Sequence, residues 1–102
     1  MDWKLKLRYG QLTTPFQHFT VIADGVVEQL EEGFECRAGK AHMGMKTWAT
    51  DAGESAEMIQ EIGTHIGFTV TGKIEVFKTE PMEPPGDNPH GYDIQFTPYN
   101  EK

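Results

Sequence analysis

Apolar and polar residues alternate over residues 41–50, and this period of two predicts a β-strand. One face of the strand is apolar or small throughout and is expected to point into the core. The opposite face combines aromatic, polar and charged side chains. The first face consists of Ala41, Met43, Met45, Thr47 and Ala49, and the second of His42, Gly44, Lys46 and Trp48.

A helical period follows this strand. Asp51 is positioned as an N-cap, and Glu54 lies three residues later, which is the spacing of a capping box. Gly67 is expected to end the helix in the left-handed conformation. These boundaries predict a helix over about 53–66, with an apolar stripe formed by Ser55, Met58, Ile59, Ile62 and Ile66.

Two more strands are predicted after the helix. Residues 68–78 form the longest strand, and Gly72 interrupts it in the manner of a bulge or a close packing neighbour. Because a helix connects 41–50 with 68–78, these two strands are expected to be parallel. Residues 80–91 hold four of the six prolines, which predicts an extended loop. The last strand spans 92–97, with Tyr92, Ile94 and Phe96 on one face.

The N-terminal part of the chain also has β character. Over 3–9, apolar residues alternate with three cations, which predicts a strand with one buried face. Residues 16–23 are rich in β-formers, and the Asp-Gly pair at 24–25 predicts a two-residue hairpin turn with 26–30 as the returning strand. An alternative interpretation is a short helix within 24–33, capped by the aspartate and ended by a glycine.

These elements predict an α+β fold, a single domain over 1–102 with one twisted, mainly antiparallel sheet of five to six strands. A single helix, about 53–66, would pack on one face of this sheet. A chain of 102 residues is long enough to bury one core without disulfides. Because one helix covers only part of a sheet, the remaining apolar surface predicts a homodimer.

The charge narrows the possible partners. The formal net charge is −7 with only nine lysines and arginines, which argues against nucleic acid and against anionic membranes as partners. No apolar run is long enough to span a membrane, and the cations near the N-terminus do not fit a signal peptide. Cys36 is the single cysteine, which fits a reducing cytoplasm. A cytoplasmic location is therefore expected.

The candidate chemistry is sparse. The four histidines have no close pair of the kind that announces a zinc site, and no nucleophile has a recognisable partner base. We therefore predict no catalytic residue, no metal site and no cofactor. His42 and Trp48 share a strand face, where an aromatic surface beside an imidazole could hold a small molecule. The predicted ligand-binding residues are His42, Trp48 and His18, the alternative being ordinary core or half-buried positions.

Three segments together carry a resemblance: DWKLKLRYGQLTTPFQHFT (2–20), GMKTWATDAGESAEMIQEIGTHIGFTVTGKIEVF (44–77) and NPHGYDIQFTPY (88–99). The chain resembles small uncharacterised bacterial proteins of the kind encoded by mobile integron gene cassettes. The resemblance implies a small, independent bacterial module of the cytoplasm. It implies no activity and assigns no site residue.

The function that these observations favour is a non-enzymatic, acidic interaction module that binds a protein partner, such as an antitoxin or immunity factor. One alternative is a small-molecule-binding domain with a cavity between helix and sheet. Another is a small hydrolase or isomerase that uses His18 or His42. The expected cavity would be lined by Met43, Met45, Met58, Ile59, Ile62, Val70 and Trp48.

Overall fold

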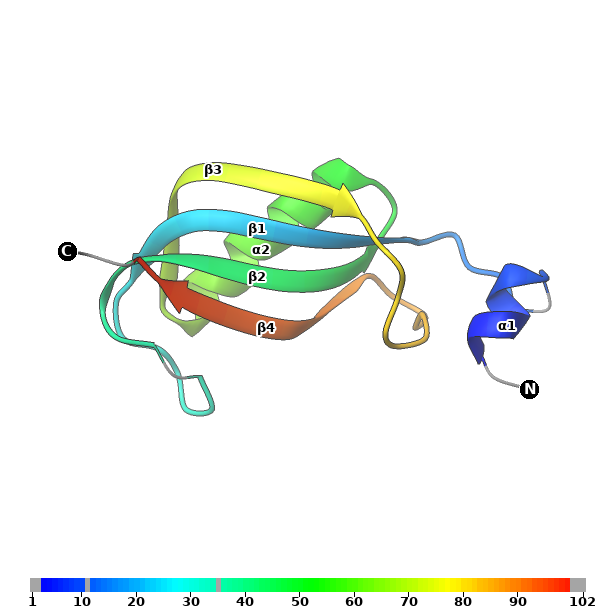
Figure 1. Ribbon diagram of the computed structural model, residues 1–102, viewed down its shortest axis with the longest axis horizontal. Helices are drawn as coiled ribbons and strands as arrows, with labels where there is room; N and C mark the ends of the chain where they lie inside the picture. The colour runs from blue at the N-terminus through cyan, green and yellow to red at the C-terminus, as the bar shows by residue number, and fades with distance from the viewer. Residues whose placement is uncertain (1–2, 11, 35, 100–102) are drawn as a thin grey trace.

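A four-stranded antiparallel sheet with one long helix across it forms the body of the protein (Figure 1). The computed structural model describes residues 3–10, 12–34 and 36–99. The strand order in the sheet is β3-β1-β2-β4. The elements are α1 (Trp3–Arg8), β1 (Gln17–Val27), β2 (Gly39–Ala49), α2 (Ala52–Ile66), β3 (Phe68–Lys78) and β4 (His90–Pro98).

The ends of α2 confirm the predicted boundaries. The Asp51 side chain accepts a hydrogen bond from the Glu54 backbone N–H at 2.8 Å, as an N-cap does. The Glu54 carboxylate accepts from the backbone N–H of Thr50 at 2.8 Å, one residue before the position expected in a capping box. Gly67 ends the helix with φ of 105°. The local sequence therefore sets both ends of α2.

The connection through α2 makes β2 and β3 parallel, as predicted, but they are not neighbours. Each pairs antiparallel with β1, which lies between them. Within the described residues, the sheet consequently has two unpaired edges, β3 and β4.

The core lies between the sheet and α2. The predicted inward face of β2 is buried, and Ile59 of the helix stripe is fully buried against it. In the part of the chain that the structure describes, no helix covers the opposite face of the sheet (Figure 1). We call it the open face, and its central side chains are those of Thr20, Ile22, His42, Lys46, Asp93, Gln95 and Thr97.

The predicted count of five to six strands and one helix is wrong in detail, since the described residues form four strands and two helices. Residues 3–9 were expected to form a strand, but Trp3–Arg8 is a helix. A strand needs a hydrogen-bonding neighbour, and this segment lies beyond the end of the sheet (Figure 1). Leucine, lysine and arginine are also good helix formers, so a lone turn of helix satisfies the backbone locally.

The predicted hairpin at 24–25 is also wrong, as is the alternative helix within 24–33. β1 continues without interruption through Asp24 and Gly25 to Val27, and the chain reverses only in the loop before β2. Gly25 is required for close approach, because a Cβ there would lie 2.2 Å from the Thr69 carbonyl oxygen. The glycine serves the packing of β1 against β3 and makes no turn.

The interruption predicted at Gly72 is confirmed. Ala23 pairs with Ile74 and Gly25 pairs with Val70, so three residues of β3 lie opposite Asp24 alone. A Cβ on Gly72 would come within 3.0 Å of the Asp24 Cβ. The position is thus both a bulge and a close packing neighbour.

Candidate functional site

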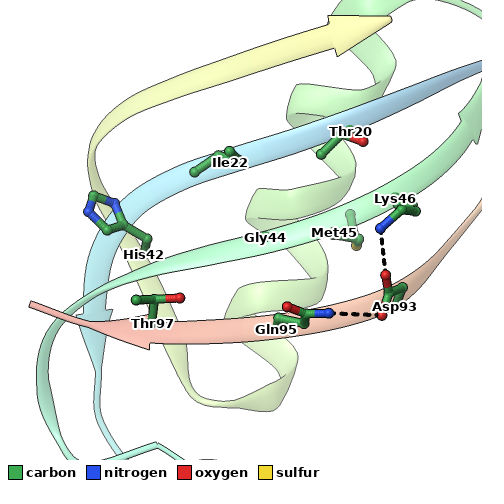
Figure 2. A pocket seen from close by; sticks show the side chains of 9 residues that line it. All are labelled: Thr20, Ile22, His42, Gly44, Met45, Lys46, Asp93, Gln95 and Thr97. Atoms are coloured by element: carbon green, nitrogen blue, oxygen red, sulfur yellow. Dashed lines mark hydrogen bonds and ion pairs between the residues drawn. The ribbon is translucent and has the colours of Figure 1, made fainter. Parts of the chain in front are cut away.

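A hollow of about 480 Å³ lies on the open face (Figure 2). Gly44 is at its centre, and an added Cβ there would meet no atom within 4 Å. The missing side chain opens the surface between β1 and β4, the two strands that flank β2. We call this space the hollow, and its lining residues are Thr20, Ile22, His42, Gly44, Met45, Lys46, Asp93, Gln95 and Thr97.

Ion pairing holds the polar wall of the hollow in place. Lys46 Nζ lies 2.5 Å from Asp93 Oδ2, and Gln95 Nε2 donates to Asp93 Oδ1 at 3.2 Å (Figure 2). The hydrogen bond from Lys46, followed by that from Gln95, lowers the pKa of Asp93 below its usual value. The carboxylate is therefore charged at neutral pH and neutralises Lys46.

His42, one of the predicted ligand-binding residues, lines the hollow at its other end. Its Nδ1 lies 2.6 Å from Asp24 Oδ1, and its ring is 4.6 Å from the Tyr99 ring, measured between centroids. An ionised carboxylate can only accept, so Nδ1 carries the hydrogen and Nε2 of the neutral ring is an acceptor. The His42 side chain is 45% exposed and accessible to a ligand.

His18 and Trp48, the other two predicted residues, lie on the same face but outside the hollow. Both are buried, at 4% and 2% exposure. Trp48 Nε1 donates to the Glu83 carbonyl at 2.9 Å, and His18 Nδ1 donates to the Thr79 carbonyl at 3.0 Å. Their polar atoms therefore hold the proline-rich loop between β3 and β4 against the sheet.

Tyr92 completes this attachment and was not among the predicted site residues. Its hydroxyl lies 2.6 Å from His18 Nε2 and accepts from the backbone N–H groups of Met82 at 2.9 Å and Glu83 at 3.3 Å. Because the hydroxyl accepts twice, it donates its hydrogen to His18. This bond and the Thr79 bond fix His18 as a neutral ring. Burial lowers the pKa of His18 below its ordinary value, and the Thr79 hydrogen bond opposes this.

A bulge explains why the alternation of β4 misled the prediction. Tyr92, Ile94 and Phe96 were expected on one face, but Asp93 adopts φ of 53° and the register shifts beside Met45. Tyr92 pairs with Lys46 on the open face, whereas Phe96 pairs with Met43 on the core side. The sequence gives only a weak signal for this register shift, because an aspartate tolerates positive φ but its presence does not predict it.

The cavity expected between helix and sheet does not have the predicted lining. Met43, Met45 and Ile59 are fully buried in the packed core, while Trp48 lies on the opposite face of the sheet. Trp48 therefore cannot line a cavity between helix and sheet together with Met43 and Ile59. The hollow around Gly44 is a different space, across the sheet from α2.

Comparisons with protein-family models, with curated proteins and with solved structures gave no match. The resemblance to integron-cassette proteins stays a prediction. Within the described residues, no three histidine, cysteine or acidic side chains gather closely enough to hold a metal ion. The helices that the structure describes include none with the length and apolarity to cross a membrane.

Proposed function

We propose that the protein binds a small polar molecule in the hollow of the open face. The observation that carries the proposal is Gly44, whose missing side chain leaves a concavity in the middle of an otherwise continuous sheet surface. Binding sites for small molecules are concave, with an apolar surface and a few placed polar groups. Here Ile22 supplies apolar surface and the ion-paired side chains supply fixed polar atoms.

The charge of the hollow favours a neutral or cationic ligand. Lys46 is neutralised by Asp93, and His42 is bonded to the carboxylate of Asp24. An anion would have to compete with these carboxylates for both groups. Hydroxyl or amino groups of a ligand suit the remaining polar atoms, which belong to Thr20, Gln95, Thr97 and His42 Nε2.

A thermal-shift screen tests the proposal, because a ligand of the folded state raises the melting temperature. The panel would contain neutral polyols and nucleosides, amines, and carboxylates. We expect a neutral or amine compound to stabilise the protein and to lose its effect in Gly44→Leu, which places a branched side chain in the middle of the hollow. Thr69→Leu is the matched control, since it adds the same side chain to an exposed position of β3 outside the hollow.

Stabilisation by carboxylates alone, or equal stabilisation of Gly44→Leu and the unsubstituted protein, would contradict the proposal. Gly44→Leu is expected to fold, because nothing lies within 4 Å of the added Cβ and the backbone is not in the left-handed region.

Charge distribution supports a second candidate function, the binding of a basic protein partner in the manner of an antitoxin or immunity factor. Three of the nine basic residues lie in α1, and the rest of the chain after Arg8 has six against fifteen acidic residues. On the outer surface of α2, Glu57 and Glu61 are exposed. Association through such a surface weakens as salt increases, so an affinity for a captured basic partner that is unchanged by salt would exclude this candidate.

A further inference from the structure

Segment 3–9 has the alternating sequence of a strand but contains a short helix, none of whose residues is fully buried. Its apolar and cationic residues alternate with period two, yet Trp3–Arg8 forms a helix of six residues with none of them buried. Isolated helices of this length are marginal in water, so little free energy opposes another conformation. Leu5 and Tyr9 are 40% and 70% exposed. Trp3 and Leu7 are half-buried, and Leu7 lies near Trp48 and Pro81, so a single chain covers this apolar face only in part.

The β3 edge of the sheet offers what the segment lacks. β3 is 11 residues long, contains no proline and, among the described residues, pairs with β1 on one side only, although it bulges at Gly72. The other edge is less open, because β4 ends at Pro98 and has Phe34, from the loop between β1 and β2, against Phe96. Both edge strands bulge, so the proline and the covering loop are the protective features that distinguish β4 from β3.

The two sides of β3 match the two faces of segment 3–9. On the α2 side, Val70, Ile74 and Val76 are only partly buried. On the open side, Glu75 is exposed and lies 3.5 Å from Lys73, and Phe77 is 46% exposed. A strand added in the register that covers the three apolar residues would also place its cations beside Glu75. That strand would carry Trp3, Leu5, Leu7 and Tyr9 on one face and Lys4, Lys6 and Arg8 on the other.

We propose that segment 3–9 pairs as a strand with the β3 edge of a second copy of this chain. α1 lies beyond the end of its own sheet (Figure 1), and the molecule measures 49 Å along its longest axis against 25 and 24 Å. The cationic segment is attracted to the acidic body of the second copy. Because each copy has both a segment and a free edge, reciprocal exchange gives a closed, two-fold dimer.

Sedimentation velocity of the full chain over a concentration series tests the proposal. We expect a species of twice the 11.5 kDa chain mass. The double variant Leu5→Ser with Leu7→Ser should dissociate at least about tenfold more readily, because two apolar contacts are lost. Folding should be unchanged, since α1 buries no residue. Thr13→Ser, an exposed position between α1 and β1, is the matched control and should keep the dimer.

Cross-linking distinguishes exchange from pairing with the chain's own β3. With Cys36→Ser as background, Leu5→Cys would be combined in turn with Val70→Cys, Ile74→Cys and Val76→Cys to cover the possible registers. A disulfide-linked dimer on a non-reducing gel is the expected result in at least one pair. A monomeric protein at every concentration, a dimer indifferent to the serine double variant, or disulfides within single chains only would each overturn the proposal.

Discussion

Tyr92 Oη and His18 Nε2 lie 2.6 Å apart, although the two residues are 74 positions apart in the chain. The bulge at Asp93 makes this contact, because it moves Tyr92 onto the open face. The same bulge places the Asp93 carboxylate against Lys46 in the wall of the hollow. One irregularity in β4 thus attaches the proline-rich loop and also shapes the candidate site.

Tyr92→Phe should destabilise the protein by about 1–3 kcal/mol, since it leaves His18 Nε2 and the N–H groups of Met82 and Glu83 without their partner. Urea unfolding measures the change. Tyr9→Phe removes the same hydroxyl from a side chain that is 70% exposed and should have no measurable effect. Equal stability of Tyr92→Phe and the unsubstituted protein would show that the Tyr92 bonds do not support the fold.

His18 should make stability depend on pH. Its folded pKa lies below the ordinary 6.5 because of burial, so the unfolded chain binds a proton at a pH where the folded protein does not. Its contribution to stability is therefore complete above pH 6.5 and is lost as the pH falls through the folded pKa. Urea unfolding across this range should show the loss, and His18→Gln should reduce it.

The control for this pH dependence is His65→Gln, at an exposed position near the end of α2. This variant should keep the fall in stability between neutral and mildly acidic pH. If His18→Gln and His65→Gln gave the same pH profile as the unsubstituted protein, the neutral buried state of His18 would be disproved.

Gly25→Ala should destabilise the protein by about 1–3 kcal/mol or more, because the added Cβ would lie 2.2 Å from the Thr69 carbonyl oxygen and 2.6 Å from the Phe68 ring. Gly44→Ala is the matched control, since its Cβ meets open space in the same sheet. Guanidinium unfolding of the two variants gives the comparison. A smaller loss at Gly25 than at Gly44 would contradict the packing of β1 against β3.

Asp51→Ala should cost about 0.5–2 kcal/mol, because the Glu54 N–H loses its cap. Glu57→Ala, on the exposed surface of α2, should change stability by less than about 0.5 kcal/mol. Thermal unfolding followed by circular dichroism compares the pair. The N-cap assignment fails if both variants melt alike.

Local chemistry made the middle of the chain predictable. Asp51 and Gly67 bound α2, and the alternation over 41–50 identified both faces of β2. These signals act within a few residues, so no knowledge of the remaining fold was needed. His42 was correctly placed on the face that proved to carry the hollow, because face assignment follows from alternation alone.

Long-range packing explains why some predictions from the sequence were wrong. The local sequence suggests a turn at Gly25, but the glycine is needed because β3 packs closely against it. The alternation over residues 3–9 suggests a strand, but within the described residues of a single chain this segment has no neighbouring strand and Trp3–Arg8 is a helix. Tyr92 joins His18 only through a register shift that its own alternation hides. Each error concerns a partner distant in sequence, which a local pattern does not specify.

Native mass spectrometry tests the central claim, that the hollow around Gly44 binds a small molecule, most directly. The protein would be incubated with the small-molecule fraction of an extract of its own host and sprayed under gentle conditions. We expect a retained small mass on the unsubstituted protein and on Thr69→Leu, and none on Gly44→Leu. An unsubstituted protein that retains nothing would contradict the claim, as would a Gly44→Leu variant that retains the same mass.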